Sequence, residues 1–267
     1  MSFEQHCIRL DGDSPGQFTE LNYYRIGPES ASRKVYLQAA IHADEQPGIL
    51  VLHHLLSLLR SADEAGLLQA VFVVFPMVNP LGMANIEFLQ HQGRYNPGTG
   101  VNFNRQWPDL SAAIDERVCS RLGDDAERNK ILVRTALRDW VEQMSTVTAV
   151  DQWRKALYRE ACDADYVFDL HCDDDSLLHI FSVPQMAQEI TSLANWTGAV
   201  ATMLAEDSGG GSFDEVWPAI WLQLARENPD KSIPLPVLSC TLEYRGQMDT
   251  YDHINQDDAA RLYAYFQ

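Results

Sequence analysis

The order of three segments constrains this fold most. A strand-like apolar run is followed directly by a helix-like pattern, and a second strand-like run comes next. The run at 34–41, KVYLQAAI, is almost continuously apolar, as a strand covered on both faces must be. The next segment, GILVLHHLLSLLR at 48–60, carries apolar residues at helical spacing and should pack against that strand. A second buried strand is predicted at 70–78, where AVFVVFPMV leads into the turn signal NPLG.

The rest of the chain continues this alternation. Further strands are predicted at 164–172, 177–183, 199–204 and 236–244. Helices are predicted within 111–162, most clearly at 129–144, and also at 217–224 and 255–267, whereas 84–110 should be a long ordered loop. Strands that alternate with helices predict an α/β fold with a mixed, mostly parallel central sheet flanked by helices. Since no repeat or low-complexity linker divides residues 1–267, we expect a single domain.

Charge and composition argue against some classes of binding partner and cellular location. The formal net charge of −18 disfavours nucleic acid and anionic membranes as partners. No apolar run is long enough to span a bilayer, and the N-terminus carries no visible secretion signal. The five cysteines are an odd number without the spacing of a disulfide framework, which favours free thiols and a reducing compartment. We therefore expect a cytoplasmic protein.

Polar residues cluster where four of the predicted strands end. Ligands of such sheets bind outside the carboxyl ends of the strands, so the four clusters are expected to form one site. The clusters are His42 with Glu45, Asn79, His171 with Asp173, and Glu243.

Two of these clusters contain the residue types of a zinc site. His42 and Glu45 alone are better explained by a solvated turn before a helix. A catalytic zinc ion, however, takes three protein ligands plus water, and imidazole and carboxylate are suitable ligands. His171, at the end of another predicted strand, supplies the third, and Asp169 or Asp173 would hold its second ring nitrogen.

The remaining candidates are charged groups near the same edge. Asn104 and Arg105 follow the long loop, and the Arg105 guanidinium is suited to hold a carboxylate through two hydrogen bonds. Arg94 is a second cation in the same loop. Glu243 ends a β-rich, mostly uncharged run, where burial would raise its pKa as a general base requires, although a structural salt bridge with Arg245 is the alternative.

With these residues assembled, the chain resembles the zinc carboxypeptidase superfamily, and within it the succinylglutamate desuccinylase and aspartoacylase branch. The matching pieces occur in the order that the family shows, between about residue 35 and residue 246. They are HADE (42–45), NPLG (79–82), Arg94, NFNR (102–105), DLH (169–171) and TLEYRG (241–246).

The resemblance implies a zinc-dependent hydrolase with one Zn²⁺ per chain, bound by His42, Glu45 and His171. It also implies that Glu243 activates water as the general base, and that Arg94 polarises the scissile carbonyl. Asn104 and Arg105 would hold the carboxylate of the substrate. A small C-terminal β-rich domain, common in the family, would be absent or truncated, because the chain ends soon after Glu243.

These implications lead to a deacylase of small N-acylated, carboxylate-bearing substrates such as N-acyl amino acids. The alternative with the same chemistry is a metallocarboxypeptidase acting on a peptide C-terminus, and a further alternative is a non-catalytic binding protein that retains the fold. A nucleotide binder is disfavoured, because SGGGS at 208–212 lacks the lysine and hydroxyl residue of a P-loop. The sequence leaves the oligomeric state open.

Overall fold

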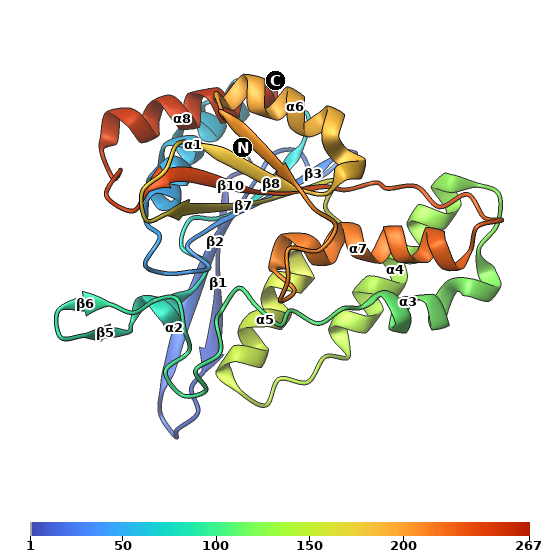
Figure 1. The fold of residues 1–267 in the computed structure, drawn as a ribbon, viewed down its shortest axis with the longest axis horizontal. Coiled ribbons are helices and arrows are strands. Elements are labelled where there is room, and N and C mark those ends of the chain that lie inside the picture. The colour runs from blue at the N-terminus through green and yellow to red at the C-terminus, as the bar shows by residue number, and fades with distance from the viewer. Residues whose placement is uncertain (1) are drawn as a thin grey trace.

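An eight-stranded sheet forms the centre of the computed structural model, which describes residues 2–267 (Figure 1). The strand order is β1-β2-β4-β3-β7-β10-β8-β9. The strands are β1 (Glu4–Asp11), β2 (Phe18–Ile26), β3 (Lys34–Ala39), β4 (Val71–Phe75), β7 (Tyr166–Asp173), β8 (His179–Ser182), β9 (Ala201–Leu204) and β10 (Leu238–Gly246). Because β4, β3, β7 and β10 pair in parallel, as do β8 and β9, the predicted α/β fold with a mixed, mostly parallel sheet is confirmed.

The buried centre of the sheet consists of β3, β7 and β10. Ala39 pairs with Leu170, and Glu243 pairs with His171, so the carboxyl ends of the three strands lie level with one another. Nearly every side chain of β3 and β7 is buried, which explains why these strands are continuously apolar in sequence. This register places the polar residues that follow β3 and those near the carboxyl ends of β7 and β10 at one edge of the sheet.

Helices cover the two faces of the sheet as separate groups (Figure 1). One group is α1 (Pro47–Glu64), α6 (Ala187–Thr197) and α8 (Asp252–Tyr265), and the other is α3 (Ser111–Val118), α4 (Ala126–Glu142), α5 (Ala149–Ala161) and α7 (Phe213–Glu227). Short turns of 3₁₀ helix lie at Cys119–Arg121 and Pro184–Met186. Within residues 2–267, no helix combines the length and the apolar character needed to cross a membrane.

The hairpin of β1 and β2 was not predicted, since the sequence analysis placed no strand before residue 34. The two strands pair antiparallel along the whole of β1, and Gly12 N donates to Gln17 O at 2.8 Å across the turn. Leu10, Leu21 and Ile26 are buried, whereas most of the hairpin is exposed or half-buried. Such a hairpin has no continuous apolar run for a sequence pattern to reveal.

Helix α7 begins earlier than the predicted helix at 217–224. It starts at Phe213, and Pro218 lies inside it. Proline has no N–H for the carbonyl of the residue four positions before it, which here is Asp214. Ser239 Oγ of β10 donates to this carbonyl at 2.7 Å instead. The carbonyl therefore keeps a hydrogen-bond partner despite the proline, and the same bond attaches the first turn of α7 to β10.

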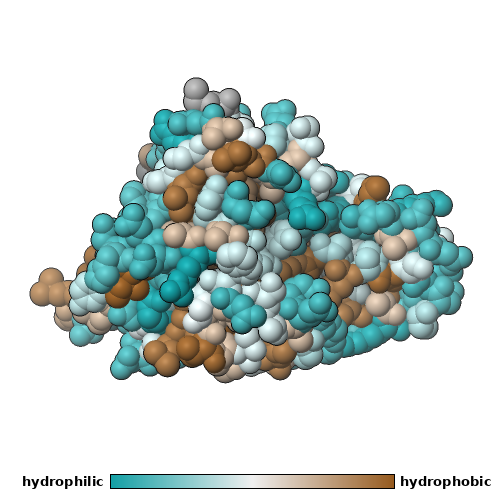
Figure 2. All heavy atoms as spheres, turned by 90° about the horizontal axis from the view of Figure 1, so that it is seen from above, coloured by the Kyte–Doolittle hydropathy of each residue, from teal (hydrophilic) through white to brown (hydrophobic). Residues whose placement is uncertain are grey.

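The long loop predicted at 84–110 contains a small hairpin. Its strands are β5 (Ile86–Glu87) and β6 (Gln90–His91), and it follows the short helix α2 (Pro80–Met83). Phe88 and Leu89 at its tip are each 99% exposed. The tip forms the apolar projection at the left end of the otherwise mostly hydrophilic surface in Figure 2.

Asn79 holds the segment that leaves β3. Its Nδ2 donates to Ile41 O at 2.7 Å, and its Oδ1 accepts from Gly82 N at 2.8 Å. Val78 N adds a bond to Ala39 O at 2.9 Å. Because Ala40 between them has a φ of 61°, a backbone angle that alanine rarely adopts, these bonds are needed to keep the segment in place.

We expect Asn79→Ala to lower the free energy of unfolding by about 2–3 kcal/mol, because a buried carbonyl and a buried N–H lose their partner. The control is Asn195→Ala on the exposed side of α6. This variant should change the free energy of unfolding by less than about 0.5 kcal/mol. Denaturant unfolding measures both, and equal values for the two variants would contradict this role of Asn79.

Candidate functional site

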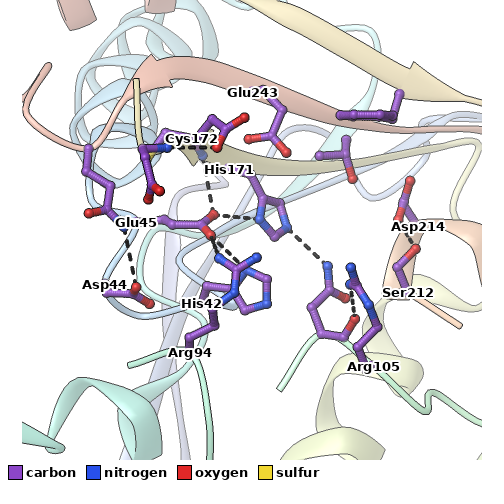
Figure 3. Close-up of a pocket in the computed structure, with 16 residues that line it drawn as sticks. His42, Asp44, Glu45, Arg94, Arg105, His171, Cys172, Ser212, Asp214 and Glu243 are labelled. Carbon is purple, nitrogen blue, oxygen red and sulfur yellow. Dashed lines mark hydrogen bonds and ion pairs between the residues drawn. The ribbon is translucent and has the colours of Figure 1, made fainter. Parts of the chain in front are cut away.

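The carboxyl ends of β3, β7 and β10 open into a cavity of about 440 Å³ (Figure 3). His42 and Glu45 lie in the turn between β3 and α1, and His171 lies on β7. All three side chains are buried, with exposed fractions of 2%, 3% and 4%. The structure therefore brings together residues that are 126 positions apart in sequence.

Glu45 lies between the two imidazoles. Its Oε1 is 2.8 Å from Nδ1 of His42, and its Oε2 is 2.7 Å from Nδ1 of His171. One potential ligand atom from each residue lies within 4.8 Å of the others, close enough to contact a single ion. Two imidazole nitrogens and one carboxylate oxygen form a donor set that suits Zn²⁺.

The opposite ring nitrogens face acceptors. Nε2 of His42 is 2.8 Å from Asn102 Oδ1, and Nε2 of His171 is 3.0 Å from Asp169 Oδ2. The Asp169 carboxylate is fully buried and neither of its oxygens has a hydrogen-bond partner among residues 2–267, so it depends on the ion pair with the protonated Nε2 of His171. With the protons on Nε2, both Nδ1 lone pairs point to the space beside Glu45, as metal ligands should. The residues present therefore fit one divalent ion.

The electrostatics of this group favour a positive charge at its centre. Burial raises the pKa of Glu45, but His171 and His42 outweigh burial and hold that pKa well below its usual range. Burial lowers the pKa of His171, whereas Asp169 and Glu45 raise it well above the ordinary histidine value. The positive charge is stabilised here whether a proton or a metal ion carries it.

Glu243 projects into the same cavity from β10 (Figure 3). Burial raises the pKa of its carboxyl to about 7, with Glu45 and Asp173 adding to the effect and His171 opposing it. Its Oε2 has no hydrogen-bond partner in the described part of the chain. The alternative of a salt bridge with Arg245 is wrong, because Arg245 pairs with Asp258. Glu243 is thus free to exchange a proton with a bound molecule.

The loop residues Arg94, Asn104 and Arg105 also line this cavity. Nη1 of Arg94 lies 2.6 Å from Glu45 Oε1. Asn104 Oδ1 accepts from Phe213 N at 2.9 Å, and its Nδ2 lies 3.3 Å from Nε2 of His171. Arg105 Nη1 donates to Asn104 O at 2.7 Å, leaving the rest of its guanidinium for a ligand. The three potential metal ligands, Glu243 and these three loop residues therefore lie around one cavity, whereas Asn79, expected at the same site, does not line it.

The loop at 208–212 covers Arg105. Gln106 N donates to Gly210 O at 2.7 Å, and Trp107 N donates to Gly211 O at 3.1 Å. Gly210 has a φ of +96°, and a Cβ at this position would lie 2.6 Å from Arg105 Cδ. Only glycine allows the loop to approach the arginine this closely.

Four residues of the far wall were missed by the sequence analysis. They are Phe181, Ser212, Asp214 and Thr241. Asp214 lies in the first turn of α7, which the analysis placed after this residue, so no predicted element directed attention to it. Asn102 was also missed as a partner of His42, although it lies within the NFNR motif.

Three further residues with reactive side chains, close in sequence to the proposed site residues, have no catalytic setting. Tyr244 is fully buried and Tyr251 is 58% exposed, and neither lines the cavity. Cys172 does line the cavity, but burial raises the pKa of its thiol far above the usual range, so it stays protonated.

Comparison with known proteins gives a family match and several related structures. Residues 31–216 match the succinylglutamate desuccinylase/aspartoacylase catalytic domain. No curated protein matches the chain.

The structural matches cover nearly the whole chain. A succinylglutamate desuccinylase/aspartoacylase family protein from Shewanella amazonensis SB2B has 27% identity and a TM-score of 0.82, covering 98% of this chain and 71% of its own. A protein described in the same terms from Shewanella frigidimarina NCIMB 400 has 24% identity and a TM-score of 0.86, covering 99% and 71%. A metallo-carboxypeptidase from Burkholderia cenocepacia shares the fold at 18% identity and a TM-score of 0.52, covering 99% and 63%.

We expect Asp169→Asn to weaken zinc binding by about 10- to 100-fold, because it replaces the anionic acceptor that orients His171. Asp173→Asn is the matched control, since Asp173 lies on the same strand but is exposed, and it should change zinc affinity by less than about threefold. Competition with a chromophoric chelator measures both affinities. His171→Ala, which removes a ligand, should bind no zinc, and equal affinities of the two aspartate variants would contradict the role of Asp169.

Proposed function

The chain belongs to the succinylglutamate desuccinylase/aspartoacylase family, and we propose that it is a zinc-dependent hydrolase that removes the acyl group from a small N-acylated amino acid. One observation carries the proposal. The free carboxyl of Glu243 shares a cavity with the buried group of His42, Glu45 and His171. A general base next to a metal-binding group is the arrangement that amide hydrolysis by activated water requires.

His42, Glu45 and His171 are the proposed zinc ligands, and Asn102 and Asp169 keep both imidazoles oriented. Zinc in this position lowers the pKa of water and polarises a carbonyl oxygen. Glu243 takes a proton from the attacking water and returns it to the nitrogen of the leaving amine. Its raised pKa suits both steps, because a group that titrates near neutrality can accept and release a proton.

The arginines position the substrate and stabilise charge. Arg105, with Nδ2 of Asn104, holds the carboxylate of the amino acid. Arg94, beside Glu45, directs its guanidinium to the oxygen on which negative charge develops during attack. The cavity of about 440 Å³ has the size of a small-molecule site, which favours a deacylase over the alternative of a carboxypeptidase for peptides.

We expect Glu243→Gln to lower kcat by about 10²- to 10⁴-fold, because it removes the proton acceptor while keeping the shape of the side chain. Elemental analysis should find about one zinc ion per chain in both the wild type and this variant. Glu206→Gln, which removes an exposed carboxylate outside the cavity, is the control and should retain full activity. Activity of Glu243→Gln near that of wild type would exclude Glu243 as the base. Bound zinc without hydrolysis of any N-acyl amino acid or peptide would favour the non-catalytic binder.

We expect Arg105→Ala to raise KM for an N-acyl amino acid by about 10- to 100-fold, because a charged hydrogen bond to the carboxylate is lost. Arg121→Ala, which removes an exposed arginine, is the control for the loss of one positive charge and should leave KM unchanged. Steady-state kinetics measure the effect, and an unchanged KM would show that Arg105 does not hold the carboxylate.

A further inference from the structure

The far wall of the cavity carries a buried carboxylate that the proposed chemistry does not use. Asp214 is 6% exposed and lies at the second position of α7. Its Oδ1 accepts from Ser212 Oγ at 2.6 Å, whereas Oδ2 has no hydrogen-bond or ion-pair partner among residues 2–267. Asp214 is buried as a residue, but Oδ2 itself remains accessible from the cavity, so a bound molecule can pair with it.

Asp214 is still mostly ionised at neutral pH although its surroundings disfavour the charge. Burial raises its pKa to about 6, while the hydrogen bond from Ser212 opposes the rise. The N-terminus of α7, which has 15 residues, favours negative charge at this position. Ser239 holds the backbone carbonyl of Asp214, so the residue is fixed in place. Asp214 is therefore a rigid anion at neutral pH.

The free oxygen has only one cavity large enough to supply a partner. Asp214 borders the main cavity of about 440 Å³ and a second one of about 20 Å³. The second cavity has room for one water molecule at most. A ligand that pairs with Oδ2 must therefore enter through the main cavity.

The charges that line the main cavity indicate which ligand this is. Six carboxylates line it against two arginines, and Arg94 already contacts Glu45. Even with a divalent ion bound, the summed formal charge of the ion and the lining side chains stays negative. The carboxylates are Asp44, Glu45, Asp173, Asp174, Asp214 and Glu243. A substrate with several carboxylates, such as the succinylglutamate of the family name, would meet repulsion here.

We propose that Asp214 binds an ammonium group of the substrate, and that the preferred substrates are N-acylated basic amino acids. Arg105 and Asp214 lie on the same side of the metal-binding group (Figure 3). The α-carboxylate pairs with Arg105, and the side-chain ammonium reaches Asp214, with the acyl carbonyl at the metal-binding group. This inference rests on the proposed deacylase function and names its substrate class.

The test compares Nα-acetyl-ornithine with Nα-acetyl-norleucine, which replaces the ammonium by a methyl group of similar size. Zinc-loaded wild-type protein should hydrolyse the ornithine compound with a kcat/KM at least about tenfold higher. In Asp214→Asn this ratio should fall to within about threefold of unity, while zinc content and activity on the norleucine compound are retained. Asp230→Asn, which removes an exposed carboxylate outside the cavity, should keep the wild-type ratio.

Two results would overturn the proposal. One is a wild-type enzyme that favours Nα-acetyl-norleucine or N-acetylglutamate, a result that needs no variant to fold. The other is an unchanged ratio in Asp214→Asn, with Asp214→Ser as the second variant if the first does not fold. Either result leaves the deacylase function standing.

If the wild type hydrolyses no N-acyl amino acid, the deacylase proposal fails, and binding tests the site directly. Calorimetry with free ornithine and free norleucine should then show tighter binding of ornithine to the zinc-loaded wild type, and no such difference in Asp214→Asn. Equal binding of the two amino acids to the wild type would overturn the ammonium site.

Discussion

The parallel pairing of β7 with β3 on one side and β10 on the other is the constraint on which the site depends. It aligns Ala39 with Leu170 and His171 with Glu243, so three distant segments leave the sheet at the same level. A slip of one residue in either pairing would turn a ligand or the base towards the opposite face. The buried side chains of these strands thus determine where the proposed ligands and the proposed base lie, although most of these side chains do not line the cavity.

The buried charges at this edge are stable only as a set. Glu45 remains ionised because two histidines and Arg94 surround it, and the histidines are held by Asn102 and Asp169 behind them. Burying any one of these groups alone would be costly, whereas together they satisfy one another. Asn79, which fixes the turn that leads to His42, belongs to the same arrangement although it touches no ligand.

The sequence predicted the parts of the fold and site that follow from continuous burial. Strands β3, β4 and β7 are apolar on both faces, and the polar residues after β3 and near the carboxyl ends of β7 and β10 therefore stood out. The solvated hairpin of β1 and β2 lacks this signal, because only one residue in several is buried. Asp214 escaped detection because the predicted helix at 217–224 begins after it, whereas α7 begins at Phe213. Only the bond from Ser239 Oγ shows how the chain accommodates a proline one turn further in.

The two halves of the cavity come from separate parts of the chain. The histidines and both glutamates belong to the sheet and its edge, whereas Arg105 and Asp214 lie on two segments that bind each other through Gln106 and Trp107. Substitutions within residues 208–214 can therefore change one half of the cavity while the metal-binding group and Glu243 keep their positions. Divergence of relatives within this family is expected to concentrate in those few positions, and laboratory evolution of new specificities should begin there.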